Sequence, residues 1–346
     1  METRPTMRTL PSGFAAIILL AATSAAAQVP DAPPPGAAAP LAGWSFTFNY
    51  ENDLLGGSDR FYTSGLQIAA RSPSRDLPGP LRWLDQRLDA LGWPGQVRWG
   101  FGIGHQIYTP RDTLTPNPDP RDRPYAAFLY GALVLQRQEA NALSTFELQA
   151  GVVGPSALGE FIQNNTHDLI RDYSANGWDR QLKDEPAVNL VFERVQRIGL
   201  GGVAGNGLDI LPSFGVSLGN VATHATAGAT LRLGQGLDAD FGPPRIRPAL
   251  VGSAFLDPPS DGARLGWYLF ASAQGRAVAR DIFLDGSTFR DSPSVDRRLL
   301  VGDVAAGFVV HWRGLRFSYT QAWRSEEFYG QRGGQAYGSV GVTARF

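Results

Sequence analysis

The sequence predicts an all-β protein: a twelve-stranded antiparallel transmembrane β-barrel with a short helix in an extracellular loop. The 346-residue chain is rich in glycine (41 residues) and in aromatic side chains (11%), and only 18% of its residues are charged. After the N-terminal region, no stretch approaches the run of about 18 apolar residues that a transmembrane helix needs. Many segments instead alternate bulky apolar residues with polar ones, as do strands with one face in lipid and one in a polar lumen.

The composition excludes several classes of protein. Lys plus Arg total 31 and Asp plus Glu total 32, so the net charge of −1 lacks the basic excess of a nucleic-acid-binding protein. The absence of cysteine excludes disulfides, thiolate metal sites and cysteine nucleophiles.

The N-terminus has the pattern of a secretory signal peptide. Arg4 and Arg8 precede an apolar run from Gly13 to Ala22, and three alanines end at Ala27. The run is too short to span a bilayer comfortably, which argues against the alternative of an uncleaved membrane anchor. We expect a signal peptide over 1–27, a Pro- and Ala-rich disordered spacer over 28–42 and the barrel over 43–346.

The first expected strand and the segment 315–324 show the alternation most clearly. In 44–51 the even positions are Trp, Phe, Phe and Tyr, and the odd positions are Ser, Thr, Asn and Glu. In 315–324 two arginines share a face with Ser and Thr, which suits a polar lumen. The alternation assigns Asn52 to the lipid-facing phase and Asp53 to the lumen phase.

Twelve segments are expected to be strands. They are 44–53, 61–71, 97–108, 125–138, 143–153, 186–198, 207–218, 223–234, 264–277, 299–312, 314–325 and 335–346. Segment 246–256 is a possible thirteenth, but Pro248 and its weak alternation argue against it, and bacterial single-chain barrels have even strand numbers. A soluble β-sandwich is the alternative fold, and the signal peptide and the terminal Phe346 disfavour it.

One connection is long enough to carry a helix. If both termini are periplasmic, the connection from Gly154 to Glu185 is extracellular, and Ser156 to Arg171 is a helix candidate directly after Pro155. The loops near Asp53, Tyr108 and His167 should then meet at the outer rim.

Histidines are the first candidates for chemistry, and there are four: His105, His167, His224 and His311. Two of them, at 105 and 311, lie inside expected strands, where a lumen-facing polar side chain needs no special role, and the one at 224 starts a strand. His167 alone lies on the loop helix, four residues after Gln163 and on the same helix face. A histidine side chain suits the role of a general base at neutral pH, although the residues alone equally allow a solvated loop histidine.

Oxygen-bearing residues close the first expected strand and open the second. Calcium prefers carboxylate and carbonyl oxygens, and Asp53 offers the first of these. Asn52, Asp53 and Thr63 are also common residue types in tight loops, which is the alternative explanation.

Taken together, three short motifs make the sequence resemble the family of outer-membrane lipid A 3′-O-deacylases over about 44–346. The motifs are the Asn52-Asp53 pair, the Tyr-Thr-Ser-Gly segment around Thr63, and the Gly-Pro segment that leads to Gln163-x-x-x-His167. The resemblance implies an outer-membrane esterase with its site facing the extracellular side. It would remove the 3′-linked acyloxyacyl group of lipid A, within the lipopolysaccharide of the outer leaflet, and we expect it to be a monomer.

The resemblance also implies the roles of single residues. His167 would activate water, and Asn52 and Gln163 would be further catalytic residues. Asp53 and Thr63 would bind Ca²⁺, which stabilises the oxyanion. A second carboxylate follows the histidine in the family, and Asp172 or Asp168 could supply it here.

Two alternatives remain. An outer-membrane phospholipase of the twelve-stranded type has its catalytic Ser two residues after its His, and none of the four histidines here has Ser at that place. A passive outer-membrane barrel or pore would need neither the Asn-Asp pair nor the Gln-x-x-x-His helix.

Overall fold

The computed structural model describes residues 43–57, 60–73, 77–93, 95–170, 173–246 and 265–346. The expected signal peptide and spacer, most of the rejected strand 246–256, and Asp172 lie outside the described residues. Within them, no helix is long and apolar enough to cross a membrane.

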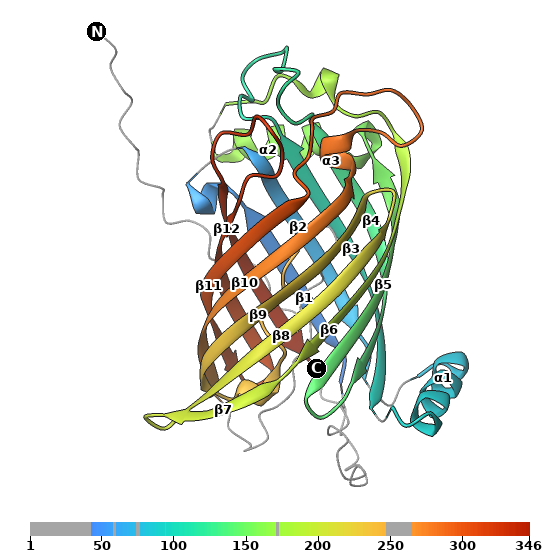
Figure 1. Ribbon diagram of the computed structural model, residues 1–346, viewed down its shortest axis with the longest axis vertical. Coiled ribbons are helices and arrows are strands. Elements are labelled where there is room, and N and C mark those ends of the chain that lie inside the picture. Colours follow the sequence, from blue (N-terminus) through green and yellow to red (C-terminus); the bar gives the residue numbers. More distant parts are fainter. Residues whose placement is uncertain (1–42, 58–59, 74–76, 94, 171–172, 247–264) are drawn as a thin grey trace.

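Antiparallel strands form one closed wall around a lumen (Figure 1). The strands are β1 (Ser45–Asn52), β2 (Phe61–Arg71), β3 (Gln96–Thr109), β4 (Ala126–Gln138), β5 (Ala142–Val153), β6 (Glu185–Gln196), β7 (Ile198–Val203), β8 (Asn206–Gly219), β9 (Ala222–Gln235), β10 (Leu265–Asp281), β11 (Leu300–Trp312), β12 (Leu315–Arg324) and β13 (Gln335–Arg345). β6 and β7 are separated only by Arg197 and both pair with β8, so they act as one strand. The thirteen elements therefore make the expected twelve-stranded barrel, closed by β1 against β13 and by β6 against β8.

The predicted alternation is confirmed in β1 and β12. Phe46 and Phe48 are 48% and 41% exposed on the outer face of β1, whereas Ser45, Thr47 and Asn49 are buried. Arg316 and Arg324 of β12 are buried on its lumen face, as expected.

Side chains and an inward-folded segment fill the lumen. Asp240 lies in the connection from β9 to β10 and accepts hydrogen bonds from Arg232 (2.7 Å), Arg316 (3.2 Å) and the hydroxyl of Tyr268 (2.9 Å). Farther along, the backbone N–H of Ile246 donates to a carboxylate oxygen of Glu51 (2.8 Å) on the lumen face of β1.

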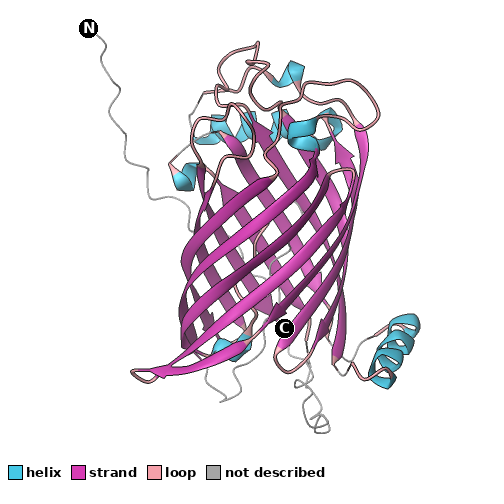
Figure 2. Cartoon of the chain, in the orientation of Figure 1, coloured by secondary structure: helices cyan, strands magenta, loops and turns pink. Residues whose placement is uncertain are grey.

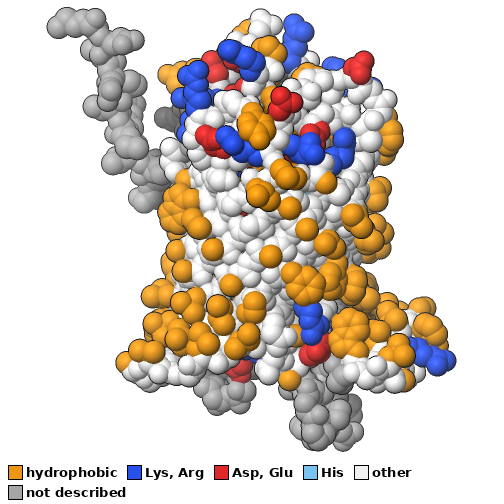
Figure 3. Space-filling view, viewed as in Figure 1, with side chains coloured by type: hydrophobic (Ala, Val, Ile, Leu, Met, Phe, Trp, Pro, Cys, Tyr) orange, Lys and Arg blue, Asp and Glu red, His pale blue; other side chains and the backbone are white. Residues whose placement is uncertain are grey.

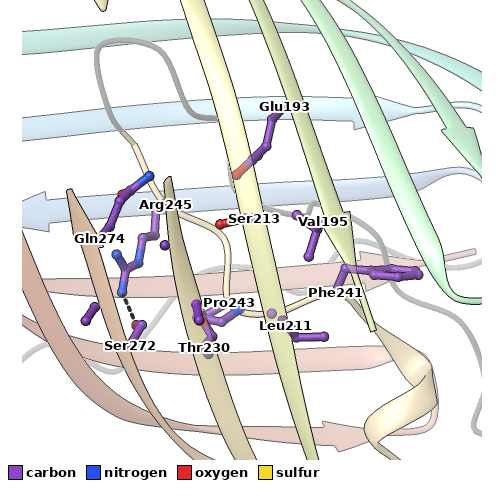
Figure 4. Close-up of a pocket in the computed structure, with 14 residues that line it drawn as sticks. Glu193, Val195, Leu211, Ser213, Thr230, Phe241, Pro243, Arg245, Ser272 and Gln274 are labelled. Atoms are coloured by element: carbon purple, nitrogen blue, oxygen red, sulfur yellow. Dashed lines mark hydrogen bonds between the residues drawn. The ribbon is translucent and has the colours of Figure 1, made fainter. Parts of the chain in front are cut away.

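The same segment borders a small lumen cavity. Figure 4 shows its Phe241, Pro243 and Arg245 among the strands, with Arg245 donating to Ser272 of β10 (2.9 Å). The cavity measures about 70 Å³, which is room for no more than a few water molecules.

Helices lie at both ends of the wall (Figure 2). The α-helices are α1 (Gly79–Ala90), α2 (Gly159–Ile170) and α3 (Ile282–Asp285), and the 3₁₀ turns are η1 (Leu54–Gly56), η2 (Pro155–Ala157), η3 (Trp178–Arg180) and η4 (Leu237–Ala239). α2 lies within the helix expected over 156–171, whereas α1 and α3 were not expected. At the α2 end, Phe283 of α3 stacks on Tyr108 of β3, with 3.9 Å between the ring centroids.

Candidate active site beneath helix α2

A cavity of about 180 Å³ lies between α2 and the outer face of the barrel wall. Asn52, Asp53 and Thr63 border it from the wall, and Gln163 and His167 border it from α2. The structure thus brings together five of the six site residues expected from the sequence. All five are at least nine-tenths buried, so the site is shielded from bulk water.

The end of β1 supplies an amide and a carboxylate. Asn52 Oδ1 accepts a hydrogen bond from the backbone N–H of Leu54 at 2.8 Å, and Asp53 Oδ2 accepts one from the backbone N–H of Arg60 at 2.5 Å. Asn52 has the lipid-facing phase that the alternation predicted. Asp53 does not point into the lumen as expected. Its backbone dihedral angles are those of a right-handed helix and not of a strand, so the alternation ends before this residue.

A bulge at the start of β2 places Thr63. The register between β2 and β3 shifts between Tyr62 and Ser64, so Thr63 has no direct partner across the strands. Its hydroxyl bonds the hydroxyl of Thr109 of β3 at 2.7 Å. Bulges that redirect a side chain are common next to active sites, and here Thr63 borders the cavity beside Asp53.

The ring of His167 is held in one orientation. Its Nδ1 lies 2.6 Å from the carbonyl oxygen of Tyr173. A carbonyl can only accept, so Nδ1 carries the hydrogen, and Nε2 of the neutral ring keeps a lone pair. A histidine oriented in this way is suited to taking a proton from a bound water.

Gln163 lies one helical turn before His167, and only one end of its side-chain amide makes a hydrogen bond among the described residues. Its Oε1 accepts a hydrogen bond from the indole N–H of Trp178 at 2.9 Å, which fixes the amide. The buried Gln163 Nε2 has no hydrogen-bond partner among the described residues. The amide group thus offers an unused donor at the cavity.

His105 is a site residue that the sequence analysis missed. It shares the outer phase of β3 with the exposed Phe101 and Ile103, so it does not face the lumen as expected. Its Nε2 donates to the carbonyl of Ala157 in η2 at 2.7 Å, and the ring borders the cavity. Because residues 101, 103 and 105 share one face of a strand, the apolar Phe101 and Ile103 would have assigned His105 to the outer face.

An apolar groove of about 400 Å³ adjoins the cavity on the outer wall. The two share Leu66, His105 and Ile162 as lining residues. The rest of the groove is lined almost wholly by apolar side chains and glycines, among them Ile68 and Phe101, on the same wall face as the lipid-facing residues.

The family of the outer membrane protein LpxR matches residues 14–346. The chain belongs to the LpxR family. This confirms the family resemblance and the outer-membrane barrel expected from the sequence. LpxR from Salmonella typhimurium has a similar structure, with a TM-score of 0.69 and 20% identity over 87% of this chain and 100% of that one.

A second solved structure is more distant. The β domain of the Bordetella autotransporter BrkA has a TM-score of 0.44 and 12% identity, covering 88% of this chain and 100% of its own. No curated protein sequence matches the chain.

The oxygen donors of this LpxR-family site fit a hard cation. Asp53 supplies one carboxylate, and Asn52 and Thr63 supply neutral oxygens that border the same cavity. The described residues hold no group of three or more His, Cys, Asp or Glu side chains that could bind a metal. A calcium ion would therefore depend on neutral oxygens and water to complete its shell, and a single carboxylate implies weak affinity.

The second carboxylate is not found among the described residues of the site. Asp172 lies outside them. Asp168 directly follows His167, so it points about 100° away around the helix, and it is exposed and does not border the cavity.

Proposed function

We propose that the chain is an outer-membrane esterase that hydrolyses the 3′-linked acyloxyacyl group of lipid A, using water activated by His167 and a calcium ion held at Asp53. The substrate would be lipopolysaccharide of the outer leaflet, which requires the α2 end of the barrel to face the cell exterior.

One observation carries this proposal: the cavity that holds His167, Asn52 and Asp53 adjoins an apolar groove on the lipid-facing wall. An ester of a membrane lipid must reach the reacting groups without moving its acyl chain into water, since each buried CH₂ contributes about 0.8 kcal/mol. The groove would hold the chain while the ester enters the cavity. A water-soluble substrate would have no use for such a groove.

The residues of the chain divide the work between them. The lone pair on His167 Nε2 takes a proton from water as its oxygen attacks the ester carbonyl carbon, and the Tyr173 carbonyl holds the resulting imidazolium in place. Collapse of the tetrahedral intermediate breaks the bond to the sugar 3′-oxygen, which takes the proton from His167. The fatty acid and the free 3′-hydroxyl then leave.

Stabilisation of the oxyanion comes from two sources. Among the described residues the buried Gln163 amide N–H has no partner, so it can donate to negative charge as it develops. A calcium ion bound at Asp53 would polarise the ester carbonyl and stabilise the same oxyanion.

A covalent serine mechanism is disfavoured. Ser64 borders the cavity, but no hydrogen bond joins it to either His105 or His167 among the described residues, and both rings already donate to backbone carbonyls. A serine nucleophile needs a base within hydrogen-bond reach. Ser64→Ala should therefore retain activity, whereas a serine esterase would lose it.

The pore alternative is also disfavoured. The lumen is occupied by the segment from Leu237 to Ile246 and by paired arginines, and the cavity beside that segment measures only about 70 Å³. An open channel would need a continuous water path along the barrel axis.

The direct test is mass spectrometry of lipid A after incubation with the purified, folded barrel and calcium. Loss of one 3′ acyloxyacyl unit is the expected result. Release of lysophospholipid from mixed micelles would support the phospholipase alternative. No change in any lipid would contradict the esterase proposal and support a passive barrel.

A further inference from the structure

Helix α1 lies outside the barrel wall, at the end opposite to α2 (Figure 1). It is tethered through its polar face. Arg137, at the end of β4, donates to Asp85 at 2.6 Å and to Asp89 at 2.7 Å, and its side chain is 3% exposed. Arg137 also donates to the carbonyl of Trp93 at 3.1 Å, which holds the end of the helical segment against the wall.

The face of α1 next to the tethered aspartates is apolar. Leu81, Leu84, Leu88 and Leu91 follow each other at helical spacing and form one stripe. Trp83 flanks the stripe. No residue of the helix is buried, and Trp83 and Leu91 are 58% and 81% exposed. Leu81, Leu84 and Leu88 are half-buried, so the protein covers the apolar stripe only in part, whereas Trp83 and Leu91 stay exposed.

We propose that the apolar stripe of α1 lies in the membrane interface, among the phospholipids of the leaflet at this rim. The stripe continues the apolar surface of the neighbouring wall: Figure 3 shows hydrophobic side chains over the lower barrel and on α1. That wall is the lipid-facing surface of an outer-membrane barrel. An apolar helix face that extends it at the strand ends meets the same bilayer.

The charged residues agree with a lipid surface. The guanidinium of Arg87 lies 5.4 Å from the ring centre of Trp83, a pairing suited to the interface, where the indole sits at headgroup level and Arg reaches toward phosphates. Since Arg137 neutralises the acidic side, Arg82 and Arg87 leave a positive surface for anionic headgroups. Helix α1 would thus fix the depth and tilt of the barrel at this rim. This inference is independent of the esterase proposal.

The chain contains no cysteine, so a single introduced cysteine can be labelled cleanly. Leu91→Cys places a label at the end of the apolar stripe, and Gln86→Cys is the matched control on the polar face. Both native side chains are exposed, so neither change disturbs a packed core. Each variant of the full chain is labelled with an environment-sensitive fluorophore and reconstituted in vesicles of phosphatidylethanolamine and phosphatidylglycerol.

Spin-labelled phospholipids should quench the label at 91 strongly and the label at 86 weakly, while aqueous iodide should show the reverse order. Equal lipid quenching at both positions, or iodide access at 91 like that at 86, would overturn the proposal. Protection of position 91 from both quenchers would also overturn it, because a protein surface would then cover the stripe. Heat-modifiable migration on gels confirms that each labelled barrel is folded.

Discussion

His105 and His167 lie against the outer face of the barrel wall, whereas His224 and His311 lie on its lumen side. All four rings are at least nine-tenths buried, so burial does not distinguish the two pairs. What differs is the surroundings. The outer pair borders a cavity that adjoins an apolar groove, and each ring is oriented by one backbone carbonyl.

The lumen surroundings are dense with opposite charges. His311 Nε2 lies 3.6 Å from Asp240, which already binds two arginines. Near the α2 end, Glu327 is enclosed in the same way: burial opposes its ionisation, but Arg324, Arg123 and Arg276 together hold its pKa below its usual value. These charges neutralise each other and hold the strands together, because removing one partner of a buried pair leaves an uncompensated charge.

The comparison shows that a buried polar side chain marks a site only where the structure leaves room and unused hydrogen-bonding capacity beside it. The outer site has both: a cavity of about 180 Å³, and the Gln163 amide nitrogen, which has no partner in the part of the chain that the structure describes. Substitutions on the outer wall should therefore change catalysis, and substitutions in the lumen should change stability.

The largest expected effect is that of removing the proposed calcium ion. Chelation should abolish deacylation and added calcium should restore it. Asp53→Asn keeps an oxygen for the Arg60 N–H but removes the charge, so activity should fall to background at low calcium and recover partly at high calcium. Calcium titrations of both proteins, with lipid A products counted by mass spectrometry, measure this. Full activity after thorough chelation would remove the metal from the proposed mechanism.

The second-largest effect is expected from removing the proposed general base, His167. His167→Ala should lower kcat by roughly 10²–10⁴-fold, the usual contribution of general-base catalysis. Unlike Asp53→Asn, it should not respond to calcium. The ring lies on α2 and not in a strand, so the barrel should still fold and show heat-modifiable migration. Wild-type activity in the folded variant would exclude His167 as the base.

The sequence predicted the wall better than the site, for a physical reason. Alternation is imposed on every residue of a strand between lipid and lumen, so β1 and β12 could be assigned face by face. The pattern fails where that constraint ends. The glycine-rich segment Ile198–Val203 is exposed throughout and shows no alternation, so β7 was missed as the continuation of β6.

Two site residues were assigned to the wrong face of the wall for related reasons. Asp53 was assigned to the wrong face because the strand stops one residue earlier. His105 was placed in the lumen because a polar residue in a strand suggested the polar side, whereas helix α2 covers that part of the outer wall. The packing of a helix on the outer wall is tertiary structure, which the alternation within a single strand does not predict.

A smaller effect is expected at His105, as a positioning residue. His105→Ala removes the hydrogen bond to the Ala157 carbonyl that ties η2 and α2 to the wall. A neutral hydrogen bond contributes about 0.5–1.5 kcal/mol, so kcat should fall by up to roughly tenfold as Gln163 and His167 lose their alignment. Gln at 105 can donate from a similar place, so His105→Gln should recover most of the loss. Equal kcat and KM in His105→Ala and the wild type would make this bond irrelevant to the reaction.

The smallest expected effect on activity is that of His311→Ala, and this variant tests the comparison most directly. His311 is as buried as His105, but its ring nitrogens make no hydrogen bond among the described residues. Its neighbour Asp240 keeps Arg232, Arg316 and Tyr268. Removing the ring should leave kcat and KM unchanged and lower the unfolding temperature slightly, through the space it vacates in the lumen. Activity assays beside thermal unfolding in detergent separate the two readouts. A loss of activity in His311→Ala, with the barrel still folded, would place part of the reaction in the lumen and contradict the assignment of the site to the outer wall.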